Sequence, residues 1–494
     1  MSLRNVFGVV GLLLRPFAFL LLLPALIDFY DGRYDSALTF AITAAVVFVG
    51  GILISRNRID PNSISRIEAM AVVANSWLLA ALLGSIPYLQ QDFSFIDAFF
   101  ESMSGFTTTG ATIFRGEDFA NATRGLFFWR SLTQWVGGMG IIVLFVAVLP
   151  ALALAGRQMF FAEAPGPEEE ALTPRIRHTA AALYRLYIGL TAIEAVLLLA
   201  FSDMDLFESV CHACTTLAAG GFSPHPQSLA GYSVSAQWIV TIFMFLAGAS
   251  FALQYRALTR PQVLRKDTEF RVYFWIVALA GVLMAAFLAN TFGTGFEESL
   301  RHGLFQAASI ITTTGYASDD FNMWSQSTLM VLAALMFIGG CAGSAGGGPK
   351  VVRIIILTKF LAREVLVALH PRVVRVIRLG GRPVPRDTTR QLIGFLVAYL
   401  TIFGVVALVA GAIENDFRVG FTGSIATLGN IGPGFGPLGP METYADLKTV
   451  TKILFIFNMW VGRLEVMTVL VLLHPELLRT LFRYRPKPKL NVDS

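Results

Sequence analysis

Four short segments of the chain place glycine beside small polar residues in one register, a pattern that suits cation coordination. The four glycines that anchor them recur at intervals of roughly 100 residues. Glycine permits backbone dihedral angles that turn carbonyl oxygens inward, where they can replace the hydration shell of an ion. Threonine hydroxyls beside it add ligands or support. The predicted coordinating residues, largely through backbone carbonyls, are Thr108, Thr109, Gly110, Ala219, Gly220, Gly221, Thr313, Thr314, Gly315, Asn430, Ile431 and Gly432.

The charge of these segments narrows the choice of ion. No carboxylate lies between the anchor glycines and the ends of the apolar stretches that precede them. Selectivity would therefore come from neutral carbonyl dipoles rather than from rings of charged side chains. This favours a large, easily dehydrated monovalent cation, K⁺ rather than Na⁺ or a divalent ion.

Short helices are expected to position the four segments. The residue four before each glycine is large and apolar, and the residues six and eight before it are small. This register is typical of a short helix that packs against a neighbour and ends where the loop begins. A helix that ends there directs its partially negative C-terminus at the cation. Four copies in one chain predict a ring of four. The large apolar residues are Phe106, Leu217, Ile311 and Leu428.

Composition places the chain in a membrane. Hydrophobic residues make up 55% of the 494 residues, charged residues 14%, and the mean hydropathy is +0.64. Soluble domains contain about 25% charged residues. The net charge of +5 does not indicate nucleic-acid binding, because the basic residues lie in loops between apolar stretches. Three cysteines provide no disulfide framework, and the Cys211/Cys214 pair is interpreted as packing.

The apolar stretches predict an all-α integral membrane fold with ten spans and four re-entrant pore helices. Two leading spans, 6–30 and 35–55, precede four units of long span, short helix, glycine loop and long span. The units use 67–90, 95–106 and 126–152; 178–201, 205–216 and 234–257; 271–291, 298–311 and 324–345; and 390–413, 416–427 and 447–473. The predicted divisions are an N-terminal hairpin, 1–60, and four pore repeats, 61–160, 161–266, 267–380 and 381–494.

Lys/Arg counting predicts that all four units share one orientation. Basic residues concentrate on the side opposite the glycine segments, above all in the cluster from Lys350 to Arg390 and in the tail after Arg479. Since basic loops stay in the cytoplasm, the glycine segments enter from outside. The repeats are then parallel, with pseudo-fourfold symmetry about the membrane normal, rather than inverted as in many transporters.

Two further features lie within predicted spans. Residues Gly339–Gly348 hold six glycines in ten positions, but they lack the Gly-Lys-Ser/Thr of a nucleotide-binding loop. The remaining interpretations are a helix kink or a flexible barrier beneath the glycine segments. Arg463 lies near the middle of the last span, where a charge is costly. We expect it to face the pathway and donate to carbonyls of this stretch; the alternative is a local pair with Glu465 or Glu442.

Over nearly its whole length the chain resembles the Trk/Ktr/HKT superfamily, and specifically its TrkH-type subunits. The resemblance rests on the four glycine segments, on Gly339-Gly-Cys-Ala-Gly-Ser-Ala-Gly-Gly-Gly348-Pro-Lys350, and on Trp460-Val-Gly-Arg463-Leu-Glu. It implies a K⁺-selective conducting subunit in a bacterial inner membrane, with an intramembrane gate. The second segment departs slightly, because Ala218 and Ala219 stand where a hydroxyl is common. The implied gate residues are Gly343, Gly346, Gly347, Gly348, Lys350 and Arg463.

The resemblance also implies partners. These are a second copy of the chain in a homodimer and cytosolic TrkA-type regulatory subunits that bind NAD(H) or ATP/ADP. No cofactor is expected on this chain itself, and K⁺ is the transported ion. Membrane lipid is a further expected partner, because the cluster from Lys350 to Arg390 could hold anionic headgroups.

Two other classes of function compete with a pore. A secondary transporter coupling K⁺ uptake to H⁺ or Na⁺ would require an ionisable residue near the glycine segments, and the sequence suggests none there. An enzyme would require clustered nucleophile and base residues within the spans, and these are also missing from the sequence.

Overall fold

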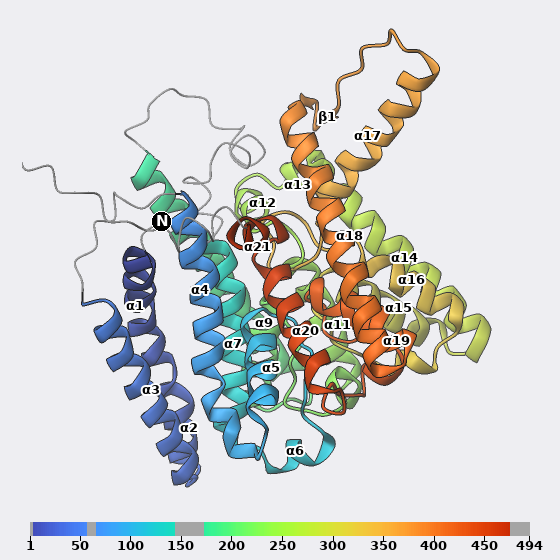
Figure 1. The fold of residues 1–494 in the computed structure, drawn as a ribbon. Helices are drawn as coiled ribbons and strands as arrows, with labels where there is room; N and C mark the ends of the chain where they lie inside the picture. Colours follow the sequence, from blue (N-terminus) through green and yellow to red (C-terminus); the bar gives the residue numbers. More distant parts are fainter. Residues whose placement is uncertain (1–2, 57–65, 144–171, 475–494) are drawn as a thin grey trace, which may run out of the picture.

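The computed structural model describes residues 3–56, 66–143 and 172–474, and this part of the chain is almost entirely helical (Figure 1). Its strands form one antiparallel hairpin, β1 (Arg378–Leu379) and β2 (Arg382–Pro383). Two predicted domain boundaries, 60/61 and 160/161, and the end of the predicted span 126–152 lie outside the described residues.

The N-terminal helices pack against each other at one side of the molecule (Figure 1). They are α1 (Leu3–Leu20), α2 (Leu22–Tyr30) and α3 (Tyr34–Ile54), which match the two predicted leading spans. Gly11 and Gly51 allow close contact between α1 and α3, since a Cβ on Gly11 would lie 2.8 Å from the Gly51 carbonyl oxygen. Small residues commonly bring membrane helices together in this way.

Four units follow, and each begins with a long helix and a short one. The long helices are α4 (Arg66–Gly84), α9 (Leu172–Phe201), α14 (Thr268–Phe292) and α18 (Arg386–Glu414). The short helices are α5 (Phe95–Phe106), α10 (Leu206–Leu217), α15 (Phe296–Ile311) and α19 (Phe417–Leu428). Each short helix ends at the large apolar residue four before its anchor glycine, within one residue of the predicted end. Polar side chains cap the start of three of them, by accepting hydrogen bonds from N–H groups of the first turn, on Ser94, Asp205 and Asp416.

The closing helices of the units differ from the prediction of continuous spans. The second breaks into α11 (Val234–Ala247) and α12 (Phe251–Ala257), bent by 102°, and the fourth into α20 (Thr449–Arg463) and α21 (Val466–Leu473), bent by 109°. The third ends early, as α16 (Gln326–Met336). Gly248 and the glycines after Ile338 supply no helix-stabilising side chain, and Glu465 adopts a left-handed φ of 62°. The predicted spans 234–257 and 447–473 are therefore broken rather than continuous, and in 324–345 the helix ends just before the glycine-rich stretch that was expected to interrupt it.

The number of helices able to cross a membrane follows from these breaks. Among the described residues, six helices are long and apolar enough, or eight if each bent pair counts as one span. The first closing helix, α7 (Arg124–Val143), and the short α16 account for the other two predicted spans.

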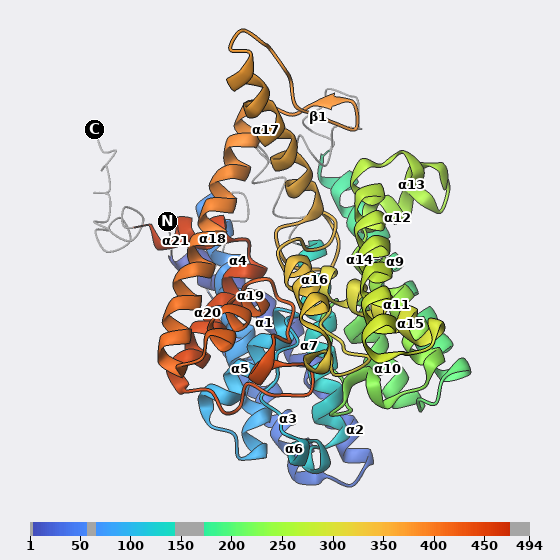
Figure 2. The same cartoon turned by 90° about the vertical axis from the view of Figure 1, so that its right-hand side faces the viewer.

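A basic arm projects from one end of the molecule (Figures 1 and 2). It consists of α17 (Val351–Leu369), the β-hairpin and the start of α18, and it carries the Lys350–Arg390 cluster. The helix α6 (Gly116–Asn121), just after the first glycine segment, lies at the opposite end (Figure 1). The remaining elements are α13 (Gln262–Lys266) and 3₁₀ turns at Ile86–Gln91, Ser228–Gly231, Phe321–Met323 and Gly436–Leu438.

Candidate functional site: a ring of four glycine segments

The four short helices end in the same hydrogen-bonded motif. In each, the N–H of the residue before the anchor glycine donates to the carbonyl five residues earlier, which closes the helix as in a Schellman motif. This motif satisfies carbonyls that would otherwise be left unpaired inside the membrane. The four bonds are Thr109 to Ser104 (2.9 Å), Gly220 to Thr215 (2.9 Å), Thr314 to Ser309 (2.9 Å) and Ile431 to Ala426 (2.8 Å).

The same motif places a non-glycine residue in the left-handed region in all four copies. This residue lies two before the anchor glycine, and a positive φ is uncommon for any side chain other than glycine. Its recurrence shows that the four segments share one backbone conformation despite different side chains. The φ values are 51° for Thr108, 54° for Ala219, 60° for Thr313 and 53° for Asn430.

The anchor glycines close the four segments into a ring, called the glycine ring below (108–110, 219–221, 313–315 and 430–432). A Cβ on Gly110 would collide with the carbonyl of Gly220, and one on Gly221 with the carbonyl of Thr314. A Cβ on Gly315 would collide with the carbonyl of Ile431. A Cβ on Gly432 would lie 2.7 Å from the carbonyl of Thr109, which returns to the first segment.

Each segment therefore touches the next in chain order, and the fourth touches the first. Glycine is needed at these four positions for two reasons. A side chain would collide with the next segment, and the φ values are positive. The twelve residues predicted to coordinate a cation are thus brought together. The φ values are 84° at Gly110, 76° at Gly221, 83° at Gly315 and 103° at Gly432.

Side chains around the ring hold its backbone in place. Asn430 donates through Nδ2 to the Thr109 hydroxyl and to the Met459 carbonyl, both at 3.0 Å. Gln134 of α7 donates to the Gly220 carbonyl at 2.7 Å and accepts from the Phe222 N–H at 3.1 Å. The first and third segments each contain a threonine hydroxyl pair at 2.7 Å, Thr107 with Thr109 and Thr312 with Thr314.

The glycine-rich stretch predicted as a kink or barrier forms an irregular loop between α16 and α17, called the 339–350 loop. It pairs with the break between α11 and α12. The Cys341 N–H donates to the Gly248 carbonyl at 2.8 Å, and the Ala345 N–H donates to Ala247 at 3.1 Å. In return, Phe251 donates to the Gly343 carbonyl at 3.1 Å.

The same loop passes next to the helix ends that carry the glycine ring. Its Gly347 N–H donates to the Thr313 hydroxyl at 2.6 Å, and the Lys350 ammonium donates to the Gly346 carbonyl. A Cβ on Gly346 would collide with the carbonyl of Thr312, and one on Gly347 with the carbonyl of Gly429. The small residues of the loop thus allow direct contact with the third and fourth segments.

Arg463 joins the loop to two other repeats. Its buried guanidinium donates to the Ala345 carbonyl at 2.9 Å and to the Gly137 carbonyl of α7 at 2.8 Å. The expected hydrogen bond to the glycine-rich stretch is therefore present. The alternative pairing with Glu465 is not observed, because that carboxylate binds Arg353 at 2.8 Å.

Glu269 is a polar contact of the loop that the sequence did not reveal. One carboxylate oxygen accepts from the Ala342 N–H at 2.7 Å and from the Val352 N–H at 3.1 Å, so it holds both ends of the loop. Its position in the first turn of the long helix α14 resembles that of an ordinary capping residue. Glu101, Arg130 and Gln134, which surround the ring from α5 and α7, are further contacts that the sequence did not reveal.

Comparison with known proteins identifies the family. The family model TrkH, described as a cation transport protein, matches residues 36–477. The chain belongs to the TrkH family. It is 37% identical to the Trk system potassium uptake protein TrkH of Vibrio parahaemolyticus, over 97% of this chain and 100% of that protein, and 35% identical to the Escherichia coli protein of the same name, over 96% and 99%.

The fold agrees with this membership. The crystal structure of the potassium transporter TrkH from Vibrio parahaemolyticus matches with a TM-score of 0.88 at 35% identity, covering 97% of this chain and 100% of that one. The predicted all-α multi-pass membrane fold is therefore confirmed, and TrkH-family membership places the chain in the inner membrane.

The donor set of the ring is neutral. In the described part of the chain, no group of three or more His, Cys, Asp or Glu side chains could hold a metal ion. Cys211 and Cys214 are buried, free thiols within α10. Backbone carbonyls and threonine hydroxyls are hard oxygen donors, so the ring suits a weakly hydrated alkali cation in transit.

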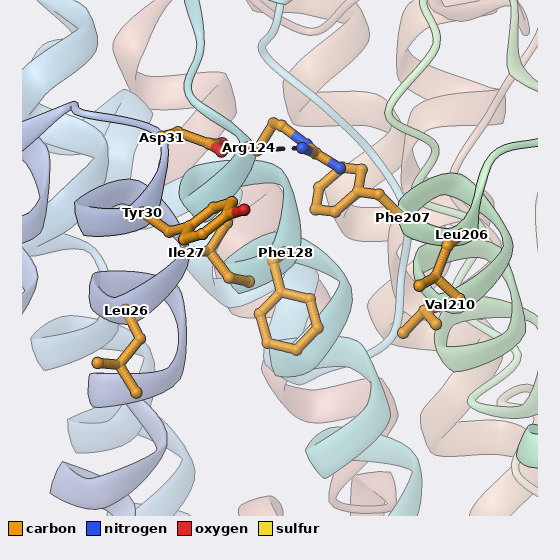
Figure 3. Close-up of a pocket in the computed structure, with 9 residues that line it drawn as sticks. All are labelled: Leu26, Ile27, Tyr30, Asp31, Arg124, Phe128, Leu206, Phe207 and Val210. Atoms are coloured by element: carbon orange, nitrogen blue, oxygen red, sulfur yellow. Dashed lines mark ion pairs between the residues drawn. The ribbon is translucent and has the colours of Figure 1, made fainter.

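A groove at the side of the molecule is separate from this site (Figure 3). It lies between α2, α7 and α10, with a volume of about 440 Å³. Arg124 lies over the ring of Phe207 at 4.6 Å and 3.8 Å from Asp31 (Figure 3). The lining residues are Leu26, Ile27, Tyr30, Asp31, Arg124, Phe128, Leu206, Phe207 and Val210, none of which belongs to the glycine ring or the 339–350 loop.

Proposed function

We propose that this chain is the K⁺-selective, ion-conducting subunit of a Trk-type potassium uptake system. Its relatives are named potassium uptake proteins, and they are transport proteins rather than enzymes. The observation that carries the proposal is that each of the four anchor glycines contacts a carbonyl of the next segment, so that the four segments close into a ring. A single chain that builds such a ring from neutral oxygens has the chemistry of a cation filter.

The twelve residues of the glycine ring form the proposed filter. Their carbonyls replace water around K⁺, with support from the Thr109 and Thr314 hydroxyls. The two threonine pairs and the Asn430 amide fix the spacing of the oxygens. The helix C-termini behind the segments add a negative potential. Na⁺ is discriminated against because its smaller radius would need a tighter ring than this scaffold allows.

The proposed gate is the 339–350 loop together with Arg463. The loop contacts the ends of the third and fourth short helices, and two cations, Lys350 and Arg463, lie against it. Positive charge in a narrow, poorly hydrated passage opposes cation entry. Displacement of the loop would break the Arg463 hydrogen bond to the Ala345 carbonyl and move Lys350 out of the pathway. Gly343, Gly346, Gly347 and Gly348 give the loop the freedom to move.

Regulation is proposed to come from partners at the end that carries the basic arm. We infer a homodimer and cytosolic TrkA-type subunits that bind NAD(H) or ATP/ADP. The relatives' names place them in a Trk system. The arm follows directly from the 339–350 loop through α17, so force on the arm would reach the loop without passing through another element.

Ion flux into liposomes tests the proposal. We expect purified protein to pass K⁺ and Rb⁺ at least about tenfold faster than Na⁺, and the regulatory subunits to change the rate but not the order of ions. Equal flux of the three ions would contradict the filter. An unchanged rate with and without the regulatory subunits, at every nucleotide tested, would contradict the proposed regulation.

Coupled transport is the second candidate, and one residue favours it. Glu194 lies within the long helix α9, fully buried, and neither of its carboxylate oxygens has a hydrogen-bond partner among the described residues. An intramembrane carboxylate of this kind can carry a proton. Single-channel recording separates the candidates: currents that reverse at the K⁺ potential fit a pore, and a reversal potential that follows the H⁺ or Na⁺ gradient fits a coupled transporter.

A further inference from the structure

A buried ion pair lies behind the first segment of the glycine ring. Glu101 is in α5, nine residues before Gly110, and it is fully buried. Its carboxylate accepts from Arg130 Nε at 2.8 Å, from the Ile113 N–H at 2.9 Å and from the Thr112 hydroxyl at 3.1 Å. The carboxylate thus joins the short helix, the chain just after the anchor glycine and the closing helix α7.

Arg130 extends this contact to the second repeat. Its Nη1 donates to the Ser223 carbonyl at 3.0 Å, two residues after the second anchor glycine, and its Nη2 donates to the Thr112 hydroxyl at 3.1 Å. Its guanidinium carbon lies 4.2 Å from the centre of the Phe222 ring and 4.4 Å from that of Phe114. The residues that follow each anchor glycine are called its outgoing chain below. One side chain therefore holds the outgoing chains of the first and second segments at a fixed separation.

The other repeats fill the matching position differently. Nine residues before the anchor glycine stand His212, Gln306 and Gly423. His212 contacts the Ser223 hydroxyl at 3.1 Å, and the Gln306 amide, in the orientation that satisfies it, accepts from the Ser318 N–H at 3.0 Å. Gly423 packs against Phe455. The first copy alone of these four positions carries a charge.

The joints between neighbouring outgoing chains show the same asymmetry. The Tyr444 N–H donates to the Thr112 carbonyl at 2.9 Å between the fourth and first repeats, and the Leu229 N–H donates to the Ala317 carbonyl at 3.0 Å between the second and third. Asn322 joins the third to the fourth at 3.0 Å. The fourth and first outgoing chains are also joined by an exposed ion pair, Arg115 with Asp446 at 2.7 Å. Arg130 differs because it makes the joint between the first and second repeats with a charged group that is buried.

We infer that the Glu101–Arg130 pair positions the first two segments of the glycine ring and so sets how strongly the ring prefers K⁺ over Na⁺. This rests on the proposed filter. Charge-assisted, multiply bonded contacts are short and geometrically specific, so they resist the contraction that a smaller ion would require. The second segment gains most, because Ala218 and Gly220 stand where the first and third segments have threonines whose hydroxyls pair with each other.

The test compares ion selectivity in four proteins reconstituted in liposomes. These are the wild type, Glu101→Gln, Arg130→Gln and the double variant. We expect each single change to lower the Rb⁺ over Na⁺ flux ratio by about tenfold, with the double variant no worse than either one. Asp28→Asn is the matched control. Its buried carboxylate also accepts three hydrogen bonds, from Ser36, Thr123 and Gly125, but it joins the N-terminal helices to α7.

Three outcomes overturn the inference. The first is an unchanged ratio with Rb⁺ and Na⁺ flux reduced in proportion, which indicates a purely structural pair. The second is an equal loss of selectivity in Asp28→Asn. The third applies if Glu101→Gln does not fold. Thr112→Val then replaces it, because this variant keeps the ion pair but removes the hydroxyl that both partners contact. A flux ratio unchanged in Thr112→Val overturns the inference.

The wild-type measurement separates this inference from the proposed function. If the wild type does not prefer K⁺ or Rb⁺, the proposed filter fails and the inference fails with it. If the wild type is selective and the variants keep its ratio, the inference alone is wrong.

Discussion

The glycine ring and the layer that contains the 339–350 loop are built by opposite rules. In the ring, four copies share one backbone, with the same helix closure, the same left-handed residue and the same contact with the next copy. In the loop layer, the closing helices differ: α11/α12 bends by 102°, α20/α21 bends by 109°, and α16 stops at Met336. Four similar sequences thus give one regular layer and one irregular layer.

The contrast fits the proposed division into a filter and a gate. A filter must surround an ion evenly, so its four parts have to match. A gate needs an element with two arrangements, and one loop inserted among unlike neighbours can move without disturbing the others. The irregular layer also concentrates the charges near the pathway, Lys350, Arg463 and Glu269, whereas the ring residues are neutral.

Breaking the regular layer should have the largest effect. Gly315→Ala places a methyl group against the Ile431 carbonyl and the Pro433 ring, at a φ of 83°. The clash and the left-handed strain together amount to about 3 kcal/mol. We expect the K⁺ over Na⁺ flux ratio in liposomes to fall about 100-fold.

Gly293→Ala is the control for backbone strain alone. Gly293 also has a positive φ, 66°, but nothing lies within 4 Å of a Cβ at that position, at the end of α14. It should keep the wild-type ratio. If Gly315→Ala also kept that ratio, the close contact between the third and fourth segments would not matter for selectivity.

Breaking the irregular layer at its central contact should raise flux without changing selectivity. Arg463→Ala leaves the Ala345 and Gly137 carbonyls without their charged donor. Hydrogen bonds to charged groups contribute about 1.5–3 kcal/mol. We expect K⁺ flux in the absence of regulatory subunits to rise about tenfold or more.

Arg463→Lys keeps the charge but cannot span both carbonyls, so it should leak less than the alanine variant. Closed-state flux equal to wild type in Arg463→Ala would show that this guanidinium does not hold the gate.

A smaller effect of the same kind is expected at the ends of the loop. Glu269→Ala leaves the Ala342 and Val352 N–H groups without their acceptor, whereas Glu269→Gln retains an acceptor oxygen. We expect a several-fold rise in closed-state K⁺ flux for the alanine variant and a near wild-type rate for the glutamine variant, measured in the same liposome assay. A similar rise in both variants would indicate that the charge of Glu269, rather than its hydrogen bonds, matters.

The same contrast explains what the sequence predicted well. The short helices end at Phe106, Leu217, Ile311 and Leu428, within one residue of the predicted ends at 106, 216, 311 and 427, because local backbone chemistry defines those ends. The glycine, the small residues before it and the large apolar residue all act within about ten positions. This local pattern is a weak signal when it occurs once, but it occurs four times in the chain, and the four copies support one prediction.

The breaks in the closing helices could not be predicted in the same way. Residues 234–257 and 447–473 are apolar enough for uninterrupted helices, and the breaks depend on contacts with the 339–350 loop far along the chain. Glu101 and Arg130 were missed because each lies among mostly apolar residues and has its partner in another helix. Their partnership across 29 positions becomes visible only when α5 and α7 lie side by side.

A ring closed by one polypeptide has a genetic consequence. In an assembly of four identical subunits, any codon change alters the oxygen cage four times over. Here a single codon alters one quadrant, so substitutions such as those that separate Glu101, His212, Gln306 and Gly423 can accumulate one at a time. In the proposed filter, the preference for one alkali metal can therefore be adjusted one segment at a time, and a single spectroscopic label reports on one side of the ring.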